Sequence, residues 1–118
     1  MKLDLKLAQI DTHVYLDAAP ETWHKNVRTY LIGTHVDVGP FLNWVEAQGK
    51  QVITEDALQD LVPSGQIMMN LCPIQVSREL WSWINLCLEK STSAQQTFHN
   101  VPELNGAEVY RRLVTPQG

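Results

Sequence analysis

The amino-acid sequence predicts an all-α protein: a compact bundle of six to seven short helices, with residues 1–16 as an N-terminal β-hairpin or extended arm. Apolar residues recur at helical spacing along most of the chain, and prolines and glycines separate the helical segments by short loops. A length of 118 residues suits one domain, with residues 17–116 as its helical core. A chain of this size buries enough apolar surface to fold without a disulfide or a metal.

Composition excludes several classes of function. The chain is 44% hydrophobic and 19% charged, with a formal net charge of −4, which describes a globular protein without long-range attraction for nucleic acid or anionic membranes. No apolar run approaches the roughly 20 residues of a membrane span, and charged residues 2 and 4 argue against a signal peptide. We therefore expect a soluble, cytoplasmic protein with no membrane partner.

The N-terminal segment has strand character. Apolar and charged residues alternate from Leu3 to Leu7, and Val14 and Leu16 repeat this period of two. Two strands alone are marginally stable, so residues 1–16 are expected to lean on the helices or on a neighbouring subunit.

Three helices are expected in the first half of the core. The first begins at residues 17–20, where proline suits a first turn, and ends at Gly33. The second begins at Asp37 and stops at Gly49, and Thr54 caps the third. Their apolar faces are Trp23, Val27, Tyr30 and Leu31, then Phe41, Leu42, Trp44 and Val45, then Ala57, Leu58, Leu61 and Val62.

Residues 64–71 are predicted to form a short helix, and Pro73 to break the pattern. Ser77 then opens the strongest helix of the chain, and a shorter helix beginning at Ser91 or Ser93 runs through Phe98. The expected inward residues are Ile67, Met68 and Leu71, then Leu80, Ile84, Cys87 and Leu88.

Trp81 and Trp83 flank the strongest helical stripe. Residues two apart on a helix face different ways, so one of the two indoles is expected to be partly exposed. An exposed indole is an ordinary surface residue or part of a contact surface, and the sequence leaves both open.

The last expected helix, residues 105–114, is the most informative segment. Asn105 is a good N-cap, and Glu108 three residues later completes a capping box. Arg111 and Arg112 place positive charge near the C-terminal end, where it suits the helix dipole. One apolar stripe runs along this helix, formed by Val109, Tyr110 and Leu113.

This segment resembles the closing helix of the first capsid-like domain in Gag proteins of copia-type LTR retrotransposons. Tyr110 stands where the family usually has tryptophan. Earlier blocks follow in the family's order, so the resemblance spans about residues 20 to 116. The matching residues are Trp23, Tyr30, Leu31, Leu80, Trp81, Asn105, Gly106, Glu108, Tyr110, Arg111, Arg112 and Leu113.

The resemblance implies a structural function. Such a capsid domain self-associates into virus-like particles that enclose the element's RNA, so the implied partner is a homo-oligomer, with RNA bound weakly or indirectly. The second helical domain and the zinc knuckle of a full Gag have no counterpart in these residues.

No residue set points to catalysis, so we expect no enzyme activity, no cofactor and no bound metal. The four histidines lack metal-ligand spacing, and the glycines form no phosphate-binding loop. Cys72 and Cys87 lie in apolar stretches and are expected to be buried free thiols rather than a disulfide.

The basic residues leave two interpretations open. Lys25 and Arg28 lie one helical turn apart, while Arg111 and Arg112 end the last helix. They form a solvated face and a dipole-complementing terminus, or they contact RNA or a neighbouring subunit. The alternatives to a capsid are a helical adaptor, including a domesticated Gag, with a peptide groove near Trp81 or Trp83, and a small helical nucleic-acid-binding protein.

Overall fold

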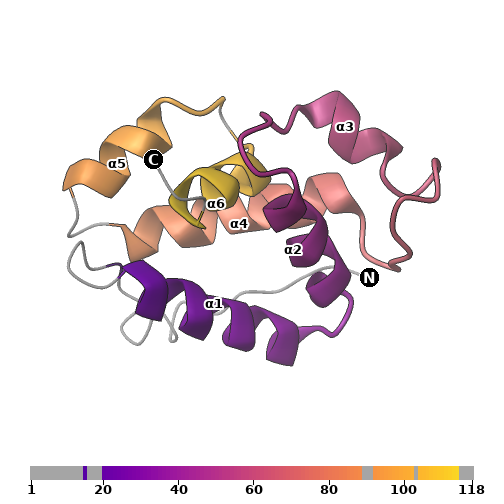
Figure 1. The fold of residues 1–118 in the computed structure, drawn as a ribbon, viewed down its shortest axis with the longest axis horizontal. Coiled ribbons are helices and arrows are strands. Elements are labelled where there is room, and N and C mark those ends of the chain that lie inside the picture. Colours follow the sequence, from indigo (N-terminus) through magenta and orange to yellow (C-terminus); the bar gives the residue numbers. More distant parts are fainter. Residues whose placement is uncertain (1–14, 16–19, 89–91, 103, 115–118) are drawn as a thin grey trace.

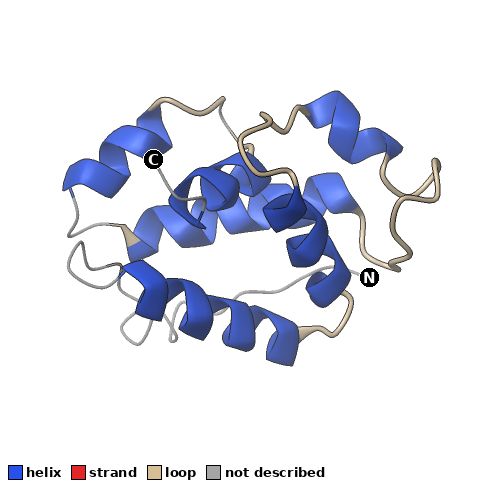
Figure 2. Ribbon diagram, viewed as in Figure 1, coloured by secondary structure: helices blue, strands red, loops and turns tan. Residues whose placement is uncertain are grey.

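Six α-helices and no strand make up the described part of the chain, which in this computed structural model comprises residues 15, 20–88, 92–102 and 104–114 (Figures 1 and 2). They are α1 (Pro20–Thr34), α2 (Val38–Ala47), α3 (Glu55–Asp60), α4 (Pro73–Cys87), α5 (Thr92–His99) and α6 (Gly106–Val114). This confirms the all-helical class. The hairpin or arm expected at residues 1–16 lies outside the described residues, Tyr15 excepted.

Helix α6 lies at the centre of the fold, although it has only nine residues. It packs most extensively on α4 and also touches α1, α2 and α5 (Figure 1). Its first six residues are all buried, including the charged Glu108 and Arg111. A helix surrounded on this many sides must satisfy its polar side chains inside the protein.

The hydrophobic core joins most of the predicted apolar faces, but Val62, expected on the buried face of the third helix, is 37% exposed because α3 ends before it. Leu80, Ile84, Cys87 and Leu88 are buried along α4, as expected, and Tyr110 of α6 is the largest fully buried side chain. The other helices contribute Trp23, Val27 and Leu31 from α1, Phe41, Leu42 and Val45 from α2, Leu58 from α3, and Ala94 and Phe98 from α5.

Gly106 allows α6 to approach α4 closely. A β-carbon added at this position would lie 2.7 Å from the Leu80 β-carbon and would also collide with the Ser77 carbonyl oxygen and the Trp81 amide nitrogen. Those two collisions are with backbone, which cannot move aside as a flexible side chain can. The close packing of α6 on α4 therefore requires glycine at position 106.

The predicted helix boundaries hold at three places. Thr54 Oγ1 accepts a hydrogen bond from Ala57 N (3.2 Å), so Thr54 caps α3 as expected. Gly49 follows α2 with a φ of +58°, a conformation that favours glycine. Asp37 is the N-cap residue of α2, where the helix was expected to begin, although its carboxylate makes no cap hydrogen bond and instead accepts one from Asn70 N (3.0 Å).

The short helix predicted over residues 64–71 is wrong: this segment forms turns and an irregular loop. Gly65 adopts a φ of +80°, which interrupts a helix, and the Trp44 indole donates a hydrogen bond to the Gln66 side chain (3.2 Å). Leu71 is buried as predicted, whereas Met68 is 88% exposed.

Helix α4 begins earlier than predicted, at Pro73 rather than Ser77. Proline has no amide hydrogen, and the first helical residue needs none, so Pro73 starts this helix instead of breaking it. Cys72 is the N-cap residue and makes no side-chain cap hydrogen bond.

Candidate functional site

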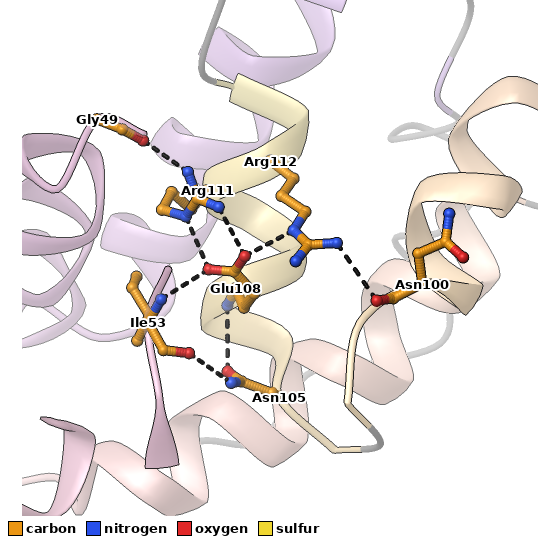
Figure 3. Close-up of polar contacts among 7 residues, drawn as sticks. All are labelled: Gly49, Ile53, Asn100, Asn105, Glu108, Arg111 and Arg112. Atoms are coloured by element: carbon orange, nitrogen blue, oxygen red, sulfur yellow. Dashed lines mark hydrogen bonds and ion pairs between the residues drawn. The ribbon is translucent and has the colours of Figure 1, made fainter. Parts of the chain in front are cut away.

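Glu108, in the first turn of α6, is the centre of a buried polar cluster (Figure 3). Its carboxylate accepts hydrogen bonds from the Ile53 backbone amide (2.9 Å) and from two guanidinium groups. Arg111 bridges both carboxylate oxygens at 2.7 and 2.6 Å, and Arg112 Nε lies 2.6 Å from Oε2. The guanidinium groups neutralise a charge that would be costly to bury alone.

Both arginines also bind backbone carbonyls of neighbouring segments. Arg111 Nη1 donates to Gly49 O (2.7 Å), and Arg112 Nη1 donates to Asn100 O (3.3 Å). The cluster therefore connects α6 to the loop after α2 and to the segment after α5 (Figure 3).

Asn105 caps α6, as predicted, and also holds the segment before α3. Its Oδ1 accepts hydrogen bonds from Glu108 N (3.2 Å) and the Ser77 hydroxyl (3.3 Å), while its Nδ2 donates to Ile53 O (2.8 Å). The second half of the predicted capping box, a contact of the Glu108 side chain with Asn105 N, is wrong. Asn105 N donates to Pro102 O (3.2 Å) instead, so the Glu108 carboxylate remains available for Ile53.

Electrostatics keep this cluster charged. Burial by itself raises the pKa of Glu108, but hydrogen bonds from Arg111, Ile53 and Arg112, together with the charge of Arg111, bring that pKa below its usual value. The hydrogen bonds to Glu108 raise the pKa of Arg111 despite its burial. A fully buried carboxylate with both oxygens occupied by protein donors holds the fold together and leaves no lone pair for a substrate.

A second polar cluster joins α1, α2 and α6. Glu46 Oε2 accepts hydrogen bonds from the Tyr110 hydroxyl (3.0 Å) and Arg28 Nη1 (2.7 Å), and His24 Nε2 lies 3.3 Å from Glu46 Oε1. Burial, followed by the charge and hydrogen bond of Glu46, raises the pKa of Tyr110. Tyr110 thus keeps its hydroxyl proton and a donor role.

The other residues of the family motifs lie in or against the core. Trp81 is the partly exposed indole of the predicted pair: its ring packs 4.0 Å from Phe98, whereas Trp83 is buried and stacks on Tyr30 at 5.5 Å. The motif residues that are buried are Trp23, Leu31 and Leu80, and those that are partly buried are Tyr30, Trp81 and Leu113.

The four basic residues expected at a contact surface do not share one surface. Arg111 lies inside the protein, Arg112 is largely covered, and both pair with Glu108. Arg28 pairs with Glu46, and Lys25, one turn earlier on α1, is exposed.

The two cysteines differ in environment. Cys87 is buried, and burial raises the pKa of its thiol to about 12 despite a hydrogen bond with Trp23. Cys72 is exposed, so its expected burial is wrong, because it stands outside the core at the start of α4. Both are free thiols. Among the described residues, no three His, Cys, Asp or Glu side chains are grouped to hold a metal ion.

A groove of about 220 Å³ opens between the segment before α3, the first half of α4 and the linker before α6. Two of its apolar residues stand at the surface: Val52 is 52% exposed and Leu104 is 43% exposed. Its lining further comprises Ile53, Thr54, Glu55, Leu58, Ile74, Ser77, Arg78, Pro102 and Asn105.

Sequence reasoning expected a groove near Trp81 or Trp83, whereas this one is lined by the preceding turns of α4 and by neither indole. The signal that could have indicated it is the apolar character of Val52 and Leu104, which lie between helices.

The fold is all-helical in the described residues. The residues that resemble the Gag motifs lie in its core or pack against it. No helix within the described ranges has the length and apolar character needed to cross a membrane. No family model, curated protein or solved structure matches the chain. The likeness to copia-type Gag proteins therefore rests on the residues quoted above.

Proposed function

We propose that this chain is a capsid-type building block that self-associates into closed particles around RNA and acts by assembly rather than by catalysis. The closing motif, which resembles that of copia-type Gag proteins, supports the proposal, because several of its residues hold this fold together. Gly106 permits the helix crossing, and Asn105 and Glu108 hold a neighbouring segment. These contacts join α6 to α4 and to the segment before α3, and a shell is built from subunits that keep one shape.

The observation that carries the proposal is a pair of exposed apolar side chains, Val36 and Met68, on neighbouring segments. Val36 is 72% exposed and Met68 is 88% exposed. Each lies within two residues of the hydrogen bond that joins Asp37 to Asn70, so both stand at the junction of the α1–α2 turn with the α3–α4 loop. Covering a methionine side chain fully contributes about 1.5–3 kcal/mol, which suits a weak contact between subunits.

Weak contacts of this size are sufficient for a closed assembly. Rings and shells repeat one interface many times, and each new contact within a closed lattice benefits from a high effective concentration. A net charge of −4 offers little resistance to the packing of like subunits.

The test is concentration-dependent assembly of the whole chain, followed by light scattering and electron microscopy. We expect oligomers or particles that the double variant Val36→Ser, Met68→Ser weakens. Val62→Ser is the matched control, because Val62 is also exposed but lies in the turn after α3. A strictly monomeric protein at high concentration, without particles, would refute the proposal.

A peptide-binding adaptor is the second candidate, and the groove at Val52 and Leu104 is the observation that favours it. An adaptor stays monomeric when concentrated and binds a peptide of another protein with the same affinity at every protein concentration. Capsid-type assembly instead predicts oligomers that grow as the protein concentration rises.

A further inference from the structure

Asn105 and Gly106 form a chemically labile pair at the start of α6. An asparagine followed by glycine readily loses its side-chain amide, because glycine has no β-carbon to hinder attack by its own backbone nitrogen. We propose that this pair is a deamidation site that the fold keeps closed, so that a chain which opens here is marked irreversibly by conversion of Asn105 to aspartate or isoaspartate. Such a site operates whether or not the chain assembles.

The reaction needs only water. The Gly106 nitrogen attacks the side-chain carbonyl carbon of Asn105, a carbon–nitrogen bond forms, and the side-chain nitrogen leaves as ammonia with the proton from Gly106 N. Water then adds to one of the two carbonyl carbons of the cyclic imide and reopens the ring as aspartate or isoaspartate. The five other asparagines of the chain precede valine, leucine or tryptophan, whose side chains hinder the same attack.

The folded protein holds the Asn105 side chain away from this reaction. Asn105 is 8% exposed, and both ends of its amide are occupied. Its Oδ1 accepts hydrogen bonds from Glu108 N and the Ser77 hydroxyl, and its Nδ2 donates to Ile53 O (Figure 3). Loss of ammonia breaks the bond to Ile53, and the ring can reopen only where water enters. The modification therefore proceeds from a locally opened state.

The fold requires both members of the labile pair. A β-carbon at position 106 would collide with backbone atoms of Ser77 and Trp81 in α4, so Gly106 cannot be replaced without cost. Asn105 combines an acceptor that caps α6 with a donor for Ile53 O, whereas aspartate, an equally good N-cap residue, has no donor. Packing and hydrogen bonding thus retain a sequence that is unstable once exposed.

The linker before α6 is a place where the chain can open. Leu104, directly before Asn105, has a φ of 68°, a conformation that costs a leucine free energy, and its side chain is 43% exposed. Opening this segment relieves the strain, which offsets part of the hydrogen-bond energy that holds Asn105 in place. The linker is therefore the segment where access to the pair begins.

The product no longer fits the closed fold. Ionised aspartate accepts hydrogen bonds but donates none, so an oxygen takes the place of the Asn105 amide nitrogen and faces Ile53 O, 2.8 Å from that nitrogen. Isoaspartate inserts the side-chain β-carbon into the backbone, which displaces Gly106 from its close crossing with α4. A converted chain therefore does not close as the natural chain does.

Peptide mass spectrometry of the natural full-length chain tests the site. The chain is incubated in buffer and in concentrated urea at the same mildly alkaline pH, and conversion of all six asparagines is followed with time. In urea we expect Asn105 to convert at least about ten-fold faster than any other asparagine, because it alone precedes glycine. In buffer we expect Asn105 to convert at least about 100-fold more slowly than in urea, since a stable fold keeps the open state rare.

Two variants connect the rate to the opening of α6. Glu108→Gln removes the counter-charge of Arg111 in the same turn, so it should raise the rate at Asn105 several-fold in buffer and leave the rate in urea unchanged. Glu55→Gln, whose ion pair with Arg78 is exposed, should change neither rate. Equal rates for the natural chain in buffer and in urea would overturn the proposal. So would a rate in urea no faster than at the other asparagines, or equal rates for the two variants in buffer.

Urea unfolding tests whether the mark is irreversible. Asn105→Asp copies the aspartate product, and Asn26→Asp adds the same charge at an exposed asparagine of α1. We expect Asn105→Asp to unfold at a clearly lower urea concentration than the natural chain, and Asn26→Asp to unfold at nearly the natural one. Equal midpoints for Asn105→Asp and the natural chain would show that a converted chain recloses, and would overturn the proposal.

Discussion

Asn105 and Glu108, three residues apart at the start of α6, bind the two backbone groups of a single residue in another segment. The Asn105 amide donates to Ile53 O and the Glu108 carboxylate accepts from Ile53 N. These side chains do for Ile53 what a neighbouring strand does in a sheet (Figure 3). The segment before α3 is irregular, and its buried backbone groups are satisfied in this way.

Replacing Glu108 by glutamine tests this relationship. The variant Glu108→Gln leaves the buried Arg111 guanidinium without a counter-charge, and breaking a buried ion pair costs about 3–5 kcal/mol of unfolding free energy. Urea unfolding measures the loss. Glu55→Gln is the control: its ion pair with Arg78 is exposed, so we expect a loss below about 1 kcal/mol. Equal losses for the two variants would contradict the central role of Glu108.

Acid should destabilise the protein through the same residue. The pKa of Glu108 is lower in the folded protein than the value of about 4.3 expected in the unfolded chain. Its contribution is therefore complete above that unfolded value and is lost as the pH falls through the folded value. Stability measured from pH 6 downward should fall less steeply for Glu108→Gln than for the natural chain. Parallel curves would show that other carboxyl groups control acid unfolding.

The glycines of α1 and α6 should respond in opposite directions to alanine. Gly106→Ala forces a β-carbon against the backbone of α4, and overpacking of this kind costs about 1–3 kcal/mol. Gly33→Ala meets no atom within 4 Å and lies in a helix, so we expect stabilisation by about 0.4–1 kcal/mol. Thermal unfolding of both variants gives the two signs. A stable Gly106→Ala protein would mean that α6 crosses α4 at a greater distance.

The two thiols should differ in reactivity. Cys72 is exposed, whereas Cys87 is buried with a pKa raised to about 12. Iodoacetamide at pH 8 should modify one thiol in the folded protein and two in urea, and peptide mass spectrometry should locate the first at Cys72. Rapid modification of Cys87 in the folded state would place the end of α4 outside the core.

Changing Cys72 to serine should also stabilise α4. Cys72 occupies the N-cap position in an extended conformation, but its side chain makes no capping bond. Serine accepts a hydrogen bond from the first turn, and a good N-cap is worth about 0.5–2 kcal/mol over a residue that cannot cap. Urea unfolding of Cys72→Ser measures the gain. Cys87→Ser, at the buried end of the same helix, should lose stability because it places a hydroxyl in the core.

Most of the secondary structure could be predicted from local patterns. The buried faces of α1, α2 and α4 follow the 3.6-residue period, and Thr54 and Asn105 cap the helices that they precede. The errors lie at prolines and glycines. Pro73 starts a helix instead of ending one, and Gly65 belongs to a loop where a helix was expected. Both residues permit more than one local structure, so their neighbours in space decide.

The charged residues of α6 could not be placed in advance. Helical spacing puts Glu108, Arg111 and Arg112 within one turn of each other, which is also what an exposed ion-pair cluster looks like. Their burial depends on the α2–α3 loop and the end of α5, which supply Gly49 O, Ile53 N and Asn100 O. The groove is equally non-local, because its walls come from three separate segments.

The order of residues along the chain was thus enough for the helical class, the apolar faces of α1, α2 and α4 and the caps at Thr54 and Asn105, because each depends on neighbours within one or two turns. Which charges are buried, where two helices touch at Gly106 and where the surface stays apolar all depend on segments far apart in sequence. Such contacts form when the core closes, and no local period encodes them.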